Sequence, residues 1–291
     1  MVNKGSPKIR KNPDMQIFLF FKQGFAFFEV RSRNKYLYLG VLRLKRHIRA
    51  LVDLLLPRTC IVCGRKLLVW ENHLCLYCLS DIPLTRFWTM TNNPMADRFN
   101  AVIQHGLEKA WEDDIPAAWE NYACAAALFF YNSEAGYRHI PYQIKYHGNI
   151  SAGRYFGRML GVQLRKAQWS SEIDLVIPVP LHWRRRWARG YNQAEIIASQ
   201  VASVLGVPMR TDLLKRLRHT TTQTRLDLAA KARNVAGAFS ASFSEDVSHI
   251  LLVDDVFTTG ATLHACFEAL RAVFPPCVRI SVATLGFVGG T

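Results

Sequence analysis

The chain has 291 residues, of which half are apolar and a fifth are charged, as is usual for a folded globular protein. Its formal net charge is +15, but residues 1–50 hold twelve Lys and Arg against two acids, whereas residues 51–291 hold twenty-five against twenty. The larger part of the chain is therefore only mildly basic, so net charge alone is a weak argument for nucleic-acid binding.

Residues 1–45 differ from the rest of the chain, because they mix basic residues with Phe-rich stretches and show no clean period. The run 17–30 is apolar but is interrupted by Lys22 and Glu29, and it falls short of the ~20 apolar residues that a membrane-spanning helix needs. It also lacks the small-residue cleavage pattern of a signal peptide. We expect an extension outside the core fold with no transmembrane segment; a membrane-surface or disordered segment stays open.

The second module, residues 46–82, combines a short amphipathic helix over residues 43–56, ended by Pro57, with two C-x-x-C pairs. Eleven residues separate the pairs, a spacing that suits a tetrahedral Zn²⁺ held by two knuckles. Because four thiolates leave no open coordination position, we expect a structural zinc ribbon, with an iron–sulfur cluster, disulfides or redox use as alternatives. The expected ligands are Cys60, Cys63, Cys75 and Cys78.

The remaining cysteines bear on the compartment. Cys124, Cys266 and Cys277 stand singly in apolar surroundings, which is more typical of buried thiols than of ligands. An odd total of seven, without secretory context, indicates a reducing cytoplasm.

Residues 83–120 are polar and contain three prolines, so we expect an irregular linker. Over residues 121–288 strands alternate with helices, which predicts an α/β domain with a mainly parallel sheet flanked by helices. Strands are expected at 123–131, 175–179, 207–210, 249–253 and 278–287, and helices at 137–146, 151–167, 192–205 and 262–274.

Residues 182–189 pack four arginines and two tryptophans into eight positions directly after a predicted core strand. Arginine forks suit phosphates and tryptophan suits base stacking, so this stretch would clamp pyrophosphate or follow a single nucleic-acid strand. The alternative is a mobile loop with solvated arginines and tryptophans that cap the core. A second basic stretch, residues 215–233, is equally well explained as a solvated surface.

The segment 249–263 carries the strongest signal. An apolar run ends in Asp254 and Asp255, and a small polar loop then opens directly into a helix. Loop amides and a helix N-terminus favour an anion, whereas two carboxylates need sugar hydroxyls or Mg²⁺ as partners. A ribose 5-phosphate satisfies both ends at once. The loop residues expected to hold its phosphate are Thr258, Thr259, Gly260, Ala261 and Thr262.

Two common nucleotide-binding motifs and an ordinary turn fit this segment less well. The chain has neither the Gly-Lys-Ser/Thr of a P-loop nor a G-x-G-x-x-G dinucleotide fingerprint here. An ordinary strand–turn–helix explains one capping residue, but not two acids followed by three threonines and a glycine.

Residues 251–263 closely resemble the phosphoribosyl-pyrophosphate-binding motif of type I phosphoribosyltransferases, and further stretches are similar to the ComF family. They occur in the family's order and the resemblance covers roughly residues 48–288, with Arg-Gly-Tyr-Asn-Gln as the most specific stretch. These stretches are residues 57–60, 144–148, 178–181, 189–195, 223–224 and 233–239.

The resemblance implies a phosphoribosyltransferase-like domain over residues 121–288, preceded by a zinc ribbon. It implies that Asp254 and Asp255 accept hydrogen bonds from the ribose hydroxyls. Arg189 and Lys145 are candidates for contacting pyrophosphate or an incoming acceptor. The expected pyrophosphate loop consists of Pro180, Leu181 and His182.

Two functions follow from these patterns. The first is an enzyme that binds phosphoribosyl pyrophosphate with Mg²⁺ and transfers its phosphoribosyl group to an unknown acceptor. The second is a non-catalytic component of bacterial DNA uptake, in which the pocket binds a nucleotide and the basic aromatic stretch holds single-stranded DNA or a helicase partner. No element specific for one base is legible, so the choice between them stays open.

Overall fold

The structure is a computed structural model, and it describes residues 16–22, 25–31, 57–90, 92–112, 121–132, 134–217 and 237–289. The chain forms two compact units, residues 1–59 with 66–72, and residues 60–65 with 73–291. In the first unit, β1 (Gln16–Lys22) and β2 (Phe25–Arg31) pair as an antiparallel hairpin. The helix expected over residues 43–56 lies outside the described residues.

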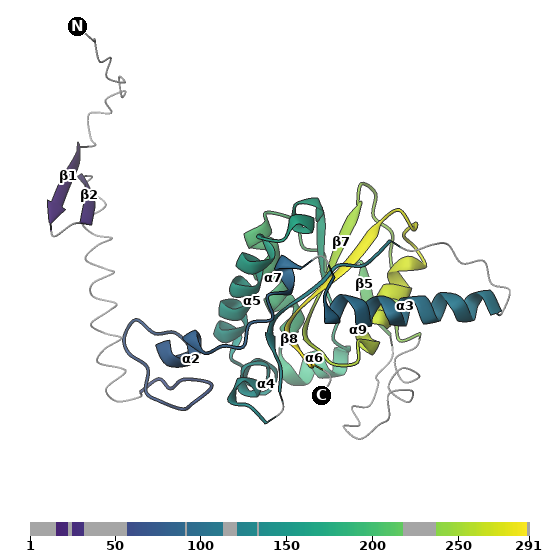
Figure 1. Ribbon diagram of the computed structural model, residues 1–291, viewed down its shortest axis with the longest axis horizontal. Helices are drawn as coiled ribbons and strands as arrows, with labels where there is room; N and C mark the ends of the chain where they lie inside the picture. Colours follow the sequence, from purple (N-terminus) through teal and green to yellow (C-terminus); the bar gives the residue numbers. More distant parts are fainter. Residues whose placement is uncertain are drawn as a thin grey trace, which may run out of the picture. The chain divides into compact units, whose positions relative to one another are not determined.

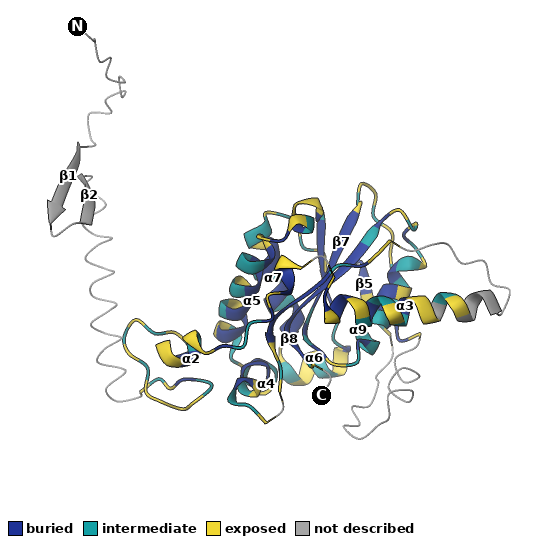
Figure 2. Ribbon diagram, viewed as in Figure 1, coloured by how far each residue is buried: buried dark blue, intermediate teal, exposed yellow. Residues whose placement is uncertain are grey.

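The second unit is built on a four-stranded sheet whose order is β3-β8-β7-β4 and whose pairs are all parallel. The strands are apolar runs buried on both faces, as parallel strands covered by helices are. Figure 2 shows them as the buried centre of this unit. Their bounds are Ala125–Phe130 for β3, Leu175–Pro178 for β4, His249–Phe257 for β7 and Arg279–Phe287 for β8.

Helices cover both faces of this sheet, with α5 and α7 on one face and α3 and α9 on the other (Figure 1). The close approach of α5 to α7 depends on glycine: a Cβ added at Gly157 would meet the Ile197 carbonyl oxygen at 2.9 Å. The helices are α2 (Leu76–Ser80), α3 (Pro94–Glu112), α4 (His139–Tyr146), α5 (Ile150–Leu164), α6 (Trp183–Arg189), α7 (Gln193–Leu205) and α9 (Ala261–Arg271).

Short elements complete the described part of the unit. The brief strand expected at residues 207–210 is reduced to a single bridge between Val176 and Met209. Three 3₁₀ turns are η1 (Phe87–Thr89), η2 (Gly136–Arg138) and η3 (Gln168–Glu172), and β5 (Leu214–Arg216) pairs antiparallel with β6 (Phe239–Ala241).

The helix α3 corrects the expectation that residues 83–120 form an irregular linker. Its N-terminal half is part of the core, since Met95, Ala96 and Phe99 are fully buried. The ring of Phe99 packs edge-on against Phe257 and Phe267. Asn93 holds the start of the helix, because its side chain accepts from the backbone N–H groups of residues 95 and 96 and donates to the carbonyl of residue 125. Sparse apolar residues among many polar ones conceal this helix in the sequence.

No helix in the described part of the chain is both long enough and apolar enough to cross a membrane.

Candidate functional site

Strand β7 delivers the two adjacent carboxylates. The sequence predicts that this strand ends at residue 253, just before Asp254 and Asp255. In the structure it continues to Phe257, so both acids lie within the strand. Asp254 pairs in register with Thr284 of β8, and its side chain accepts from the backbone N–H of Asp255 at 2.8 Å. Asp255 is buried, with 3% of its surface exposed. Asp254 is less buried than Asp255, with an intermediate exposure.

The loop that follows β7 presents backbone donors. Among the described residues, no acceptor pairs with the backbone N–H groups of Thr258, Thr259 or Gly260. Gly260 adopts a left-handed conformation with φ 80° at the start of α9, which turns the loop onto the helix N-terminus. The Thr259 hydroxyl accepts from the Ala261 N–H at 3.3 Å. Adjacent free amides at a helix start fit an anion.

Arg98 of α3 supports this loop. Its guanidinium donates to the carbonyl of Val288 at 2.9 Å and to that of Thr258 at 3.3 Å, and it lies over the ring of Phe287. The sequence patterns do not single out this residue, because it stands in the segment expected to be a linker.

The amine of Lys145, a residue of α4, lies next to the β7 carboxylates. Its Nζ forms an ion pair with Asp255 at 2.9 Å. Burial favours the neutral amine, but the negative charges of Asp255 and Asp254 outweigh it and raise the pKa of Lys145. Burial and the Asp255 charge raise the pKa of Asp254 to about 7, although Lys145 opposes this. A carboxyl group with this pKa gains from a partner that stabilises its charge.

The expected pyrophosphate loop follows β4, beside β7. His182 is buried, and its Nδ1 accepts from the Arg184 N–H at the start of α6. The next residue, Trp183, is the first of the helix α6. The alternative that residues 182–189 form a mobile loop is therefore wrong. Trp183 and Trp187 are 64% and 87% exposed, so neither caps the core.

Arg189 is the last residue of α6, and its described contacts are with residues other than Asp254 and Asp255. Its guanidinium donates to the Gln193 side chain and lies 5.3 Å from the ring of Tyr146. Tyr191 donates to the carbonyl of Ile144, which ties the segment after α6 to α4.

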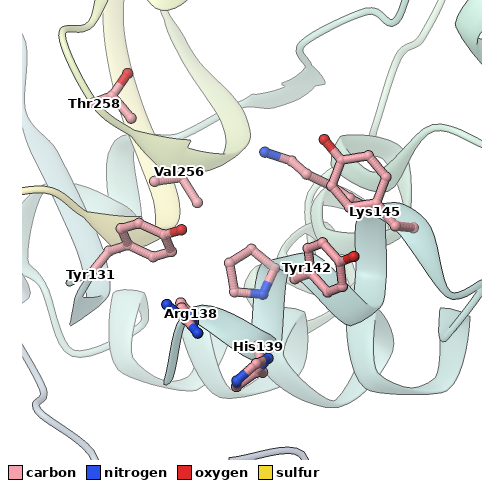
Figure 3. A pocket seen from close by; sticks show the side chains of 9 residues that line it. Tyr131, Arg138, His139, Tyr142, Lys145, Val256 and Thr258 are labelled. Atoms are coloured by element: carbon pink, nitrogen blue, oxygen red, sulfur yellow. The ribbon is translucent and has the colours of Figure 1, made fainter. Parts of the chain in front are cut away.

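Two cavities meet at the end of α4, where Lys145 and Tyr146 line both. The first has a volume of about 520 Å³ and lies between α4, the residue after β3 and the end of β7. In Figure 3 the Lys145 amine points into this cavity, with Tyr131 and Val256 on one side and Tyr142 on the other. The second, of about 410 Å³, lies between α4 and α6 and is lined by arginines 185 and 189. Both volumes suit a small molecule.

The tyrosines of the first cavity are not among the candidates that the sequence predicts. Tyr131, Tyr142 and Tyr146 belong to two segments that meet only in the folded chain. The only signal in the sequence is the family-like stretch around residues 144–148.

The four cysteines of the two C-x-x-C pairs come together in the second unit. Their sulfur atoms lie within 4.8 Å of one another, and the Sγ atoms of Cys63 and Cys75 are 3.7 Å apart. Four sulfurs at about 2.3 Å from one tetrahedral metal are separated by about 3.8 Å, whereas a disulfide brings two sulfurs to about 2.05 Å. Burial opposes ionisation of Cys60, but backbone donors in both knuckles lower its pKa to about 7. The cluster thus fits a metal site with thiolate ligands.

The cysteine cluster is bonded directly to the helices that carry the first cavity. The buried hydroxyl of Tyr137 donates to the Cys78 carbonyl at 2.9 Å. A Cβ at Gly136 would meet the carbonyl oxygen of residue 62 at 2.9 Å. The Nε2 atom of His73 stands 3.1 Å from the Ser151 hydroxyl of α5. The turn before α4 therefore rests on the cluster.

Comparisons with known proteins agree with this architecture. A family model described as "Phosphoribosyl transferase domain" matches residues 192–285. Competence protein F of Haemophilus influenzae is 35% identical over 135 residues, which cover 44% of this chain and 59% of that protein. DNA utilization protein YhgH of Salmonella typhi is 31% identical over 127 residues, which cover 43% and 56%. An orotate phosphoribosyltransferase structure from Aeropyrum pernix has a TM-score of 0.27 and 13% identity over 61% of this chain and 77% of that one, which is too remote to bear on the site.

These matches extend over less than two thirds of each relative's own length. The matched domain contains β7, its carboxylates and the loop into α9, and the four-cysteine cluster lies near the N-terminus. With the ordered motifs of the sequence, they lead to one assignment. Residues 192–285 form a phosphoribosyltransferase domain, and the chain is similar to competence protein F and YhgH, as its ComF-like motifs indicate, with four cysteines placed so that they could hold a metal ion.

Proposed function

We propose that the chain binds phosphoribosyl pyrophosphate at the end of β7 and transfers its phosphoribosyl group to an acceptor nitrogen. The observation that carries this proposal is the pairing of two carboxylates with a loop of free amides in one segment. The amides of residues 258–260 suit the 5-phosphate, and Asp254 and Asp255 suit the ribose hydroxyls. Lys145, Arg189 and the loop of Pro180, Leu181 and His182 would face the pyrophosphate or the acceptor.

The transfer requires that donor and acceptor be held in place and that the negative charge on the leaving pyrophosphate be stabilised. The C1–O bond to pyrophosphate breaks with its electron pair on oxygen, and C1 gains a bond to the acceptor. Asp254 and Asp255 would hold a Mg²⁺, which would supply positive charge against the leaving group. The cations that line the second cavity, Lys145, Arg185 and Arg189, would stabilise the same charge.

Calorimetry tests this proposal. We expect Asp254→Asn combined with Asp255→Asn to abolish Mg²⁺-dependent binding of the donor while the fold is kept. Asp246→Asn, at an exposed turn outside the site, is the matched control and should bind as the wild type does. Unchanged donor affinity in the double variant would refute the site.

We propose zinc as the metal of the cysteine cluster, since four sulfurs at this separation suit it and leave no open position. The role would be structural. Elemental analysis of protein purified without chelator should give one zinc per chain, and iron or no metal would contradict it. Free thiols at such a site persist in a reducing compartment, which is why we place the protein in the cytoplasm.

A second function, single-strand binding, is favoured by α6. Trp183 and Trp187 are four residues apart and exposed, so they lie on one side of the helix beside Arg184 and Arg186. Exposed aromatic rings among arginines suit stacked bases and phosphates. The relatives' names refer to competence and DNA utilization, and a DNA-uptake helicase would be a partner in this second function.

This function is separable from the donor site. We expect salt-dependent binding of single-stranded DNA that persists in the double Asn variant and falls about tenfold in Trp183→Ala with Trp187→Ala. Equal binding by the tryptophan variant would exclude α6 as the DNA surface.

A further inference from the structure

The helix α6 has two faces with different chemistry. Arg185, Ala188 and Arg189 line the second cavity, and their spacing of three and four residues places them on one side of the helix. Trp183 and Trp187 each stand two residues from Arg185, which turns them about 160° away from it around the helix axis. Both tryptophans are exposed. The donor site and the single-strand surface therefore use opposite faces of one helix.

The arginine face of α6 is close to the carboxylates of β7. Burial and the positive charge of Arg185 lower the pKa of Arg216, a residue of β5, and the negative charge of Asp254 opposes this. Arg185 and Asp254 therefore both lie near Arg216. Lys145, which is ion-paired with Asp255, lines the same cavity as Arg185. An anion in the second cavity thus lies against α6 and beside the carboxylates.

The helix itself is weakly held. The structure describes all seven residues of α6, and none of them is buried. Two of its links to other elements run between partly exposed side chains: Arg186 forms an ion pair with Glu195 at 2.7 Å, and Arg189 lies over the ring of Tyr146. An element with few buried contacts opens locally at a low free energy. A ligand that binds either face of α6 therefore has to order it.

The segment that carries α6 is fixed at its base. The buried side chain of Asn192, just before α7, donates to the carbonyl of Val179 at 3.0 Å. The Val179 N–H in turn donates to the carbonyl of Val253 in β7 at 2.9 Å. Gly190 ends the helix with φ 82°, and an added Cβ there would have no atom of the described residues within 4 Å. Residues 180–191 can therefore change their order as one piece while the sheet stays as it is.

We propose that α6 couples two ligands, so that a donor bound at its arginine face and single-stranded DNA bound at its tryptophan face each tighten the binding of the other. The inference rests on both proposed functions and adds their regulation. The first ligand to bind meets the entropic cost of ordering α6, and the second ligand then binds to a helix that is already ordered. Because such coupling is reciprocal, each ligand must change the affinity of the other by the same factor.

The experiment uses the full chain and measures a closed cycle of binding constants. Calorimetry gives the Kd of phosphoribosyl pyrophosphate with Mg²⁺, alone and with a saturating oligothymidylate of about 20 nucleotides. Fluorescence anisotropy gives the Kd of the labelled oligothymidylate, alone and with saturating donor. We expect both Kd values to fall by the same factor, of about fivefold or more.

Hydrogen exchange tests the cause of this coupling. Exchange over residues 182–191 should slow with either ligand alone and change little more when the second ligand is added. Exchange in η3, which precedes the opposite end of β4, should be the same with and without ligands. Slower exchange of α6 with only one of the two ligands would contradict a shared ordering step.

A variant controls for the charge of the added donor. Asp254→Asn combined with Asp255→Asn should still bind the oligothymidylate, but phosphoribosyl pyrophosphate should no longer tighten that binding. Kd values that are independent of the other ligand, or that rise because the ligands compete, would overturn the coupling and leave both sites standing. A chain that binds no donor would refute the first proposed function together with the coupling, and a chain that binds no oligothymidylate would refute the second in the same way.

Discussion

At the scale of single residues, the ionised carboxylate of Asp254 destabilises the fold. Asp254 is held close to Asp255 in a buried setting, and its pKa rises to about 7 from an ordinary value near 3.8. Lys145 forms its ion pair with Asp255. Such a shifted group is typical of functional sites, where a ligand relieves the unfavourable electrostatics of the empty state.

The shift predicts how stability depends on pH. Between about pH 4 and pH 7 the folded state keeps a proton on Asp254 that the unfolded chain has lost, so this group destabilises the fold as the pH rises. In Asp254→Asn the penalty is absent. The free energy of unfolding of this variant, relative to wild type, should therefore grow between pH 5 and pH 8, by on the order of 2 kcal/mol.

Urea unfolding at both pH values measures this difference. Asp246→Asn, at an exposed turn, should show a difference that is the same at both pH values. A constant difference for Asp254→Asn as well would mean that its carboxyl group titrates normally in the folded protein.

Gly260 tests the loop itself. Its φ is 80°, and an added Cβ would meet the Cζ atom of Phe257, a ring 1% exposed, at 2.8 Å. Gly206 has φ 79° but no atom within 4 Å of an added Cβ, so it carries the backbone strain without the clash. We expect Gly206→Ala to cost about 1 kcal/mol of stability and Gly260→Ala about 2 kcal/mol or more.

Donor affinity separates the two glycines further. Because the loop amides must keep their directions to hold a phosphate, Gly260→Ala should weaken donor binding in calorimetry, whereas Gly206→Ala should not. Equal costs in stability and equal donor affinities would show that Phe257 moves aside freely and that the turn is not needed.

At the scale of elements, hydrophobic patterning explains most of the α/β domain. Buried parallel strands are continuous apolar runs, so β4 and β8 lie close to where the sequence indicates them. The helix α3 is missed because its buried apolar residues, Met95, Ala96, Phe99 and Ile103, are few among many polar ones. The extension of β7 is missed because charged residues rarely occupy a central strand.

Some parts of the candidate site can be predicted from local sequence, and others depend on how distant segments pack. The carboxylates and the phosphate loop stand in one segment, so local sequence is enough to bring them together. Tyr131 follows β3, whereas Tyr142 and Lys145 belong to α4, and the meeting of these two segments depends on the packing of α4 against the sheet edge and the cysteine cluster. No local pattern encodes that packing. The four cysteines are the exception, because metal spacing is itself a local pattern.

The link between the cysteine cluster and α4 predicts an effect of metal removal. Tyr137 of η2 donates to the Cys78 carbonyl, so loss of the metal should loosen the turn that begins α4. Hydrogen exchange over residues 136–146 should therefore speed up when a chelator removes the metal. Exchange in the central strand β7 should stay slow.

A conservative variant tests whether the hydrogen bond from Tyr137 to the Cys78 carbonyl protects this turn from exchange. Tyr137→Phe keeps the ring and removes the hydroxyl, so metal content should be unchanged while residues 136–146 exchange faster and the free energy of unfolding falls by about 1 kcal/mol. Uniform loss of protection across the second unit on chelation would show that the metal holds the whole domain and not this turn.

At the scale of the whole molecule, the excess of basic residues and the candidate site lie in different parts of the chain. Residues 1–45 contain ten Lys and Arg against two acids, and all of them belong to the first compact unit. The carboxylates, both cavities and the four cysteines belong to the second. We propose that residues 1–45 are an extension outside the core fold, that residues 46–82 form the metal module, and that the phosphoribosyltransferase-like domain covers residues 121–288 and recruits α3.

Deletion of residues 1–45 tests this division. The shortened chain should unfold at the same temperature within about 2 °C, because no residue of the second unit is removed. Its donor affinity should also be unchanged, since both cavities and β7 are kept. Non-specific binding to single-stranded DNA should fall and lose part of its salt dependence, because the deletion removes a net charge of +8 (ten basic residues less two acids). A lower unfolding temperature with weakened donor binding would instead make these residues part of the working fold, and unchanged DNA binding would leave α6 as the basic surface that matters.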